Sequence, residues 1–175
     1  METSKRLKMT IKDITVIGMM VAVIEVCKMA MSFLPNIELT SFWLIMFTLF
    51  FGKKILLVVP VFILLEGTIY PFGPWWMMYL YIWPLLVLIV WMLRKNQSVW
   101  FWSILSGLFG LSFGFLCSFY YMVTGAVDGG LRSGLYAGFT WWVAGIPWDI
   151  AHCAGNFVLM LVLYTPVRSV MKKIS

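Results

Sequence analysis

The sequence predicts an all-α integral membrane protein, a bundle of six transmembrane helices with both termini in the cytoplasm. Of its 175 residues, 62% are hydrophobic and only 11% are charged, whereas soluble domains are about 45–50% apolar and about 25% charged. The apolar residues fall into six stretches that short polar or proline- and glycine-containing segments separate. We therefore expect residues 1–175 to form a single membrane domain, as in a multi-pass protein of the bacterial plasma membrane.

Each of the six stretches is interpreted as one span, since a membrane helix needs about 20 apolar residues. The second and third are short for full spans. Between the fifth and the sixth, the segment 124–134 contains four glycines, and we expect a polar loop there, either a lid over a site or a plain connector. The six stretches cover about 14–34, 39–51, 55–69, 75–93, 99–123 and 135–164, the last of which Pro147 divides.

The positive charges fix the orientation. With the N-terminus inside, six spans place 11 of the 13 basic residues on the cytoplasmic side, as the positive-inside rule requires. They lie in a basic N-terminus (1–13), two short loops and a basic tail (165–175). The net charge of +6 is therefore a topology signal and an attraction to the lipid bilayer, not a nucleic-acid site. The 11 residues are Lys5, Arg6, Lys8, Lys12, Lys53, Lys54, Arg94, Lys95, Arg168, Lys172 and Lys173.

Most acidic residues gather toward the opposite side. In this topology Glu38, Glu66 and Asp149 fall in the outer half of the membrane or in outer loops, near Trp75 and Trp142. Carboxylates within a bilayer usually face a bundle interior or a wet cavity, and aromatic walls with a few polar groups are typical of small-molecule sites. Loop solvation, interhelical hydrogen bonds and an interfacial tryptophan belt are the alternatives that this pattern leaves open.

The sixth stretch has one polar face. Asp149, His152 and Asn156 lie on the same side of a helix at 100° per residue, and His152 is the only histidine. This face could bind a polar ligand, or it could clamp the helix to its neighbours. The predicted substrate-binding residues are Glu38, Glu66, Trp75, Trp142, Asp149, His152 and Asn156.

Four short segments give the chain a resemblance to a known family. They are Gly18-Met-Met-Val-Ala22, Pro35-Asn-Ile-Glu-Leu39, Phe51-Gly-Lys-Lys54 and Asp149-Ile-Ala-His-Cys-Ala-Gly-Asn156. With six spans in under 200 residues, the chain resembles the substrate-binding S-component of an energy-coupling factor (ECF) vitamin transporter. The resemblance implies high-affinity binding of a vitamin or micronutrient for uptake, together with a membrane coupling subunit and two cytoplasmic ATPases. It also implies that Gly18 and Ala22, in place of the family's AxxxA pair, dock the coupling subunit.

The pocket chemistry narrows the ligand. Several carboxyl groups with one lysine, one arginine and one histidine in the outer half favour a neutral or cationic ligand over a polyanion. The aromatic residues favour a flat heteroaromatic ring, such as thiamine or its pyrimidine fragment, a pyridoxal-type vitamin or a flavin.

Other functions are weighed against this one. No GxxxxGK[ST] phosphate loop is present, so ATP hydrolysis must come from a partner. A small proton-coupled transporter is one alternative. An intramembrane hydrolase using His152 and Asp149 is another, but no serine lies in a nucleophile turn and a metal site lacks ligands. We therefore expect that the protein is not an enzyme and that it binds neither a cofactor nor a metal ion.

Overall fold

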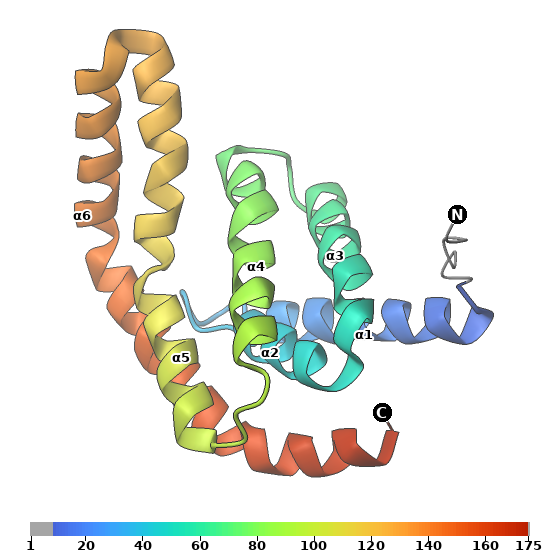
Figure 1. The fold of residues 1–175 in the computed structure, drawn as a ribbon. Coiled ribbons are helices and arrows are strands. Elements are labelled where there is room, and N and C mark those ends of the chain that lie inside the picture. Colours follow the sequence, from blue (N-terminus) through green and yellow to red (C-terminus); the bar gives the residue numbers. More distant parts are fainter. Residues whose placement is uncertain (1–8, 175) are drawn as a thin grey trace, which may run out of the picture.

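The computed structural model describes residues 9–174, and within this range the chain is helical without strands (Figure 1). Lys5, Arg6 and Lys8 of the predicted basic N-terminus lie outside the described residues. The elements are α1 (Ile11–Ala30), α2 (Thr40–Phe51), the 3-10 turn η1 (Gly52–Lys54), α3 (Ile55–Ile69), α4 (Pro74–Leu93), α5 (Val99–Leu111) and α6 (Phe113–Ile174).

Three helical stretches of the described chain are long and apolar enough to cross a membrane: Thr40–Ile69, Pro74–Leu93 and Val99–Lys173. The first joins the predicted second and third spans, which only the turn η1 separates. The third joins the predicted fifth and sixth. Helix α1 is 20 residues long, but it contains four charged residues, Lys12, Asp13, Glu25 and Lys28.

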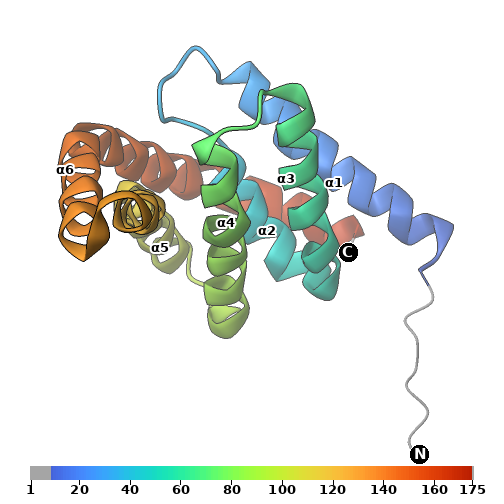
Figure 2. The ribbon, with the colours of Figure 1, turned by 90° about the horizontal axis from the view of Figure 1, so that it is seen from above.

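Helices α1 to α4 form one half of the molecule. Helices α3 and α4 run side by side, and α1 crosses α3 (Figure 1). Figure 2 shows the same group from above, with α2 enclosed between α4 and the last part of α6. Apolar side chains such as Ile24, Leu44, Phe62 and Trp83 are fully buried here and form the core.

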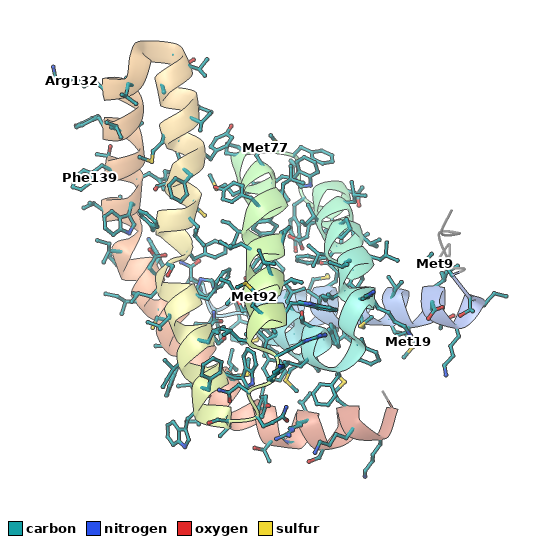
Figure 3. The ribbon with its side chains drawn as sticks, in the orientation of Figure 1. Met9, Met19, Met77, Met92, Arg132 and Phe139 are labelled. Carbon is teal, nitrogen blue, oxygen red and sulfur yellow. The ribbon has the colours of Figure 1, made fainter. Side chains whose placement is uncertain are left out.

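The other half is a long helical hairpin. The backbone of α6 leaves the helical conformation only at Gly129 and Gly130, so its residues 113–128 and 131–174 are two antiparallel arms. The first arm continues the direction of α5, and the second returns alongside it before bending under α2 (Figure 1). Arg132 lies at the tip of the hairpin and Phe139 points away from it (Figure 3).

The predicted loop over 124–134 is wrong: these residues are helical except at the two-residue turn. Gly130 provides the positive φ (80°) that the turn needs. The other glycines serve close packing, because a Cβ on Gly134 would collide with the carbonyl oxygen of Met122, and one on Gly125 would lie 3.0 Å from Ala137. A mobile lid at this position has no basis in the structure. The predicted tail at 165–175 is likewise helical through Ile174, although Pro166 lies within it.

Candidate functional site

A cavity of about 400 Å³ lies where the two halves meet, a size that suits a small molecule. It is bounded by the C-terminal ends of α1 and α3, the connection between α1 and α2, the first turns of α4, and α6. The lining residues are Lys28, Met31, Ser32, Leu34, Asn36, Ile37, Glu38, Glu66, Tyr70, Trp75, Tyr79, Phe113 and His152.

An ion pair between Lys28 of α1 and Glu66 of α3 forms one wall. Glu66 is 1% exposed and Lys28 is 19% exposed, so the lysine lies on the open side of the pair. Its ammonium also donates a hydrogen bond to the hydroxyl of Tyr79, at 3.3 Å. Glu66 is 38 residues and Tyr79 is 51 residues from Lys28 in the sequence. The packing of α1 against α3, and of α3 against α4, brings the three groups together.

Aromatic rings surround the same ammonium. The Nζ atom of Lys28 lies 5.9 Å from the ring centroid of Phe62, 5.6 Å from that of Tyr70 and 5.1 Å from that of Tyr79. Cations within about 6 Å of a ring face are attracted by its quadrupole. Trp75 extends this wall, with its ring edge-on to Tyr79 at 5.3 Å. The site is therefore an aromatic cage closed on one side by a carboxylate.

Two further carboxyl groups lie close to this cage. Glu25 is one helical turn before Lys28 and lies next to Glu66. It is 5% exposed, and neither of its oxygens has a hydrogen-bond partner among the described residues. Glu38 lies in the connection between α1 and α2, where desolvation raises the pKa of its carboxyl group. Three carboxyl groups thus face one lysine, and Oε1 of Glu66 also lacks a partner within the described chain.

His152 of α6 closes the side of the cavity opposite the aromatic cage. It is 4% exposed, its ring packs on Phe113 with centroids 5.0 Å apart, and its Nε2 has no hydrogen-bond partner within residues 9–174. A buried ring nitrogen without a partner beside a cavity is available to a ligand, because burying a polar group unpaired is costly.

The cavity brings together four of the seven predicted binding residues: Glu38, Glu66, Trp75 and His152. The other three lie outside its lining and contact protein groups.

Asp149 accepts a hydrogen bond from the backbone N–H of Gly114, at 2.8 Å. Asn156 donates one to the carbonyl oxygen of Ser106, at 3.2 Å. Trp142 packs edge-on against Phe115. The polar face of the sixth stretch is thus divided: only His152 reaches the cavity, while its two neighbours tie the arms of the hairpin together.

Sequence reasoning missed Lys28, Tyr70, Tyr79 and Phe113 as parts of the site. Lys28 did give a signal, since a lysine inside an apolar stretch and one turn from a glutamate is rarely accidental. The aromatic residues gave none, because the chain has 14 Phe, 10 Trp and 7 Tyr and only the fold decides which of them meet.

The predicted docking pair lies away from the cavity. Gly18 and Ala22 are exposed on α1, and outside the adjoining backbone of α1 no atom of residues 9–174 comes within 4 Å of a Cβ added to Gly18. Glu25, two turns further along, is buried. Helix α1 therefore presents a small-residue surface in its middle and lines the site at its C-terminal end.

A second cavity, between α3 and α4, is almost wholly apolar. Its volume is about 510 Å³, and Lys53 is the charged residue in its lining. Specific ligand sites combine apolar walls with convergent polar groups, so the first cavity is the better candidate.

No family model, no curated protein and no solved structure matches this chain.

Proposed function

We propose that this protein is the substrate-binding subunit of an ECF-type vitamin transporter, with six spans and both termini in the cytoplasm. The observation that supports it best is the cavity, in which an aromatic cage, the Lys28–Glu66 pair and the unpaired Nε2 of His152 converge. Apolar walls with a few directed polar groups are the usual chemistry of small-molecule recognition.

The ligand in this proposal is a flat heteroaromatic molecule that is neutral or cationic. Trp75, Tyr70 and Tyr79 provide faces and edges for a ring. Glu38 and Glu66 accept hydrogen bonds from ring substituents, and His152 offers one more polar contact. The volume of about 400 Å³ suits a ligand of vitamin size.

Energy for uptake comes from partners. The exposed Gly18 and Ala22 let another helix approach closely, as the membrane coupling subunit would, and two cytoplasmic ATPases complete the complex. The docking surface lies in the middle of α1 and the binding site at its C-terminal end, so ligand capture and complex formation are separable.

Mass spectrometry of small molecules released from the detergent-purified protein tests the binding function. After expression in rich medium, we expect a vitamin-like compound at close to one molecule per chain, and its loss from the Glu66→Gln variant. A preparation without ligand that also fails to bind any member of a vitamin panel, followed by tryptophan fluorescence, would contradict the proposal.

A substitution on the docking surface tests the partner. Gly18→Leu should abolish uptake while leaving ligand affinity unchanged, because the position is exposed and a Cβ there meets no other described part of the chain within 4 Å beyond the adjoining backbone of α1. Gly145→Leu is a matched control on α6, since its surroundings are equally open, and it should leave uptake intact. Unchanged uptake in the Gly18 variant would remove this surface from the docking site.

A small proton-coupled transporter is the second candidate. The buried group of Glu25, Lys28 and Glu66 favours it, because titratable residues within membranes often relay protons. The two functions differ in their energy source. Uptake that stops with a protonophore but needs no ATPase would favour proton coupling, and uptake that needs the ATPases would favour the ECF-type complex.

The hydrolase alternative has less support. Asp149 does not bond to His152 among the described residues, since its Oδ1 accepts from the backbone N–H of Gly114 and its Oδ2 has no partner. A catalytic pair would need the carboxylate to orient the imidazole.

A further inference from the structure

We propose that Lys28 is a tethered occupant of a cation subsite, and that a positively charged group of the ligand displaces its ammonium from the aromatic cage. This inference rests on the proposed binding function and specifies the ligand further: of the neutral and cationic ligands that the pocket allows, it selects those with an organic cation next to a flat ring.

The surroundings of the Lys28 ammonium are those of an ammonium receptor. Three ring centroids, of Phe62, Tyr70 and Tyr79, lie 5.1–5.9 Å from Nζ, and Glu66 neutralises the charge from the fourth side. Aromatic cages of this kind recognise quaternary and primary ammonium groups. The rings of Tyr70 and Tyr79 belong to the cavity lining, so the cage is open to a ligand.

The carboxyl groups exceed what one lysine can satisfy. Oε1 of Glu66 and both oxygens of Glu25 are buried without a hydrogen-bond partner in the described chain, and Glu38 faces the same cavity. Buried unpaired carboxyl oxygens are costly. Glu38 and Glu66 line the cavity, so a ligand that brings a positive charge or several N–H donors can satisfy them, whereas an anionic ligand offers them no such partner.

The position of Lys28 allows its ammonium to move out of the aromatic cage. It lies in the last turn of α1, two residues before the helix ends at Ala30, and it is the more exposed partner of the pair (19% against 1%). Its flexible four-carbon stem lets the ammonium swing toward solvent, while Glu66 stays fixed within α3. The side chain can therefore exchange with a ligand without a change of the backbone.

Displacement makes a quantitative prediction about affinity. If Lys28 fills the cage nine-tenths of the time, only about one-tenth of the molecules can bind a cation, and the apparent Kd rises about tenfold. Removing the lysine should therefore tighten the binding of a cation. If Lys28 instead held an anionic group of the ligand, its removal would weaken binding, so the two roles differ in sign.

The test uses benzyltrimethylammonium, a small aromatic cation, with benzyl alcohol and benzoate as neutral and anionic controls. Binding to the full-length purified protein is followed by tryptophan fluorescence and by the shift in melting temperature. In Lys28→Met we expect about tenfold tighter binding of the cation than in the wild type. Lys28→Arg keeps the tethered cation and should resemble the wild type. Glu66→Gln should bind the cation at least about tenfold more weakly than Lys28→Met.

Several results would overturn the inference. One is weaker or unchanged cation binding in Lys28→Met, and another is preferred binding of benzoate by the wild type that this substitution abolishes. Lys28→Gln repeats the measurement if the methionine variant does not fold, as judged by gel filtration. If a vitamin binds the wild type and its affinity does not increase in Lys28→Met, the proposed transport function still holds, but the role of Lys28 as a tethered occupant is wrong. If the vitamin panel fails but the cation result holds, the cage stands and the transport function falls.

Discussion

At the scale of single residues, Glu66 and Asp149 show how two buried acidic side chains can serve different ends. Glu66 is paired with a lysine that lines a cavity, and one of its oxygens is unpaired within the described chain. Asp149 is 5% exposed and accepts a hydrogen bond from the N–H of Gly114, at the first turn of α6. One oxygen of Asp149 is also unpaired among the described residues, but only Glu66 lines the cavity. Glu66 is therefore within reach of a ligand, while Asp149 holds two arms of a hairpin together.

We expect Asp149→Ala to destabilise the protein by about 1–3 kcal/mol, because it leaves the Gly114 N–H buried without its acceptor. Asp149→Asn keeps an acceptor oxygen and should lose less. Thermal unfolding in detergent measures both. The folded fraction of either variant should bind ligand with wild-type affinity. A stable Asp149→Ala protein with weakened binding would instead make Asp149 a ligand contact.

The sequence predicts that the polar residues of the sixth stretch share one face, but it does not indicate which of them line the cavity and which hold the hairpin together. The helical spacing of Asp149, His152 and Asn156 correctly placed them on one face. Which of them reaches the cavity depends on where α5 runs, since Gly110 lets the backbone at His152 come within 2.9 Å of the position of a Cβ. That approach is a property of the packed pair of helices, and periodicity within one helix contains no information about it.

At the scale of elements, the start of α1 is fixed by local hydrogen bonds. Thr10 and Asp13 form a capping box, in which each side chain bonds to the backbone of the other, and Lys54 of η1 forms an ion pair with Asp13 at 3.0 Å. The hydrogen bonds from Thr10, followed by the contact with Lys54, lower the pKa of Asp13. Asp13 belongs to the N-terminal segment that the charges predict to be cytoplasmic, outside the proposed spans.

This cap predicts a dependence on pH. A carboxyl group whose pKa is lower in the folded state stabilises the fold above its unfolded pKa of about 4 and loses that effect as the pH falls through the folded value. Thr10→Ala should cost about 1 kcal/mol. The difference in melting temperature between the wild type and Asp13→Asn should be present at pH 7 and shrink as the pH falls below about 4. A difference that does not change with pH would show that the carboxylate charge is unimportant.

The hairpin depends on glycines at the contact between α5 and α6. A Cβ on Gly110 would lie 2.9 Å from the backbone carbon and oxygen of His152, too close for any side chain. We expect Gly110→Ala to destabilise the protein by about 1–3 kcal/mol, as overpacking does. Gly145→Ala is the matched control, because its surroundings are open and alanine favours the helix. Equal melting temperatures of the two variants would contradict this packing.

The glycines also explain why the sequence predicted a loop where the chain is helical. Four glycines in 124–134 suggested a flexible connector, because glycine lowers helix propensity. Gly125 and Gly134 instead remove side chains where the two arms approach closely, and Gly130 makes the turn. Propensity is a weak guide when tertiary packing requires small residues.

At the scale of the whole molecule, composition predicted the class well and the number of separate helices less well. The chain is helical throughout residues 9–174 apart from short connections, and three of its helical stretches are apolar enough to span a membrane. Two of these contain a pair of predicted spans each. Their joints, the turn η1 and the pair Gly129 and Gly130, are so short that helices merge across them.

The orientation of these spans is a prediction of the charges. The arm from Val99 to Asp128 would be about 45 Å long at 1.5 Å per residue, longer than the hydrocarbon core of about 30 Å. Its tip at Asp128 therefore reaches beyond the core when the arm stands upright, on the side opposite the basic loop at Arg94 and Lys95.

Single cysteines test this topology in intact cells. In a background without Cys27, Cys117 and Cys153, we expect Asp128→Cys to react with a membrane-impermeant maleimide and Lys95→Cys to react only after the cells are permeabilised. Both positions are exposed, so a lack of reaction reflects sidedness and not burial. Labelling of Lys95→Cys alone in intact cells would invert the orientation, and labelling of both would require an even number of spans, or none, between them. The first result would place the cavity with Glu66 on the cytoplasmic side, and the second would leave its side undefined. In both cases, uptake through an outward-facing site would lose its support.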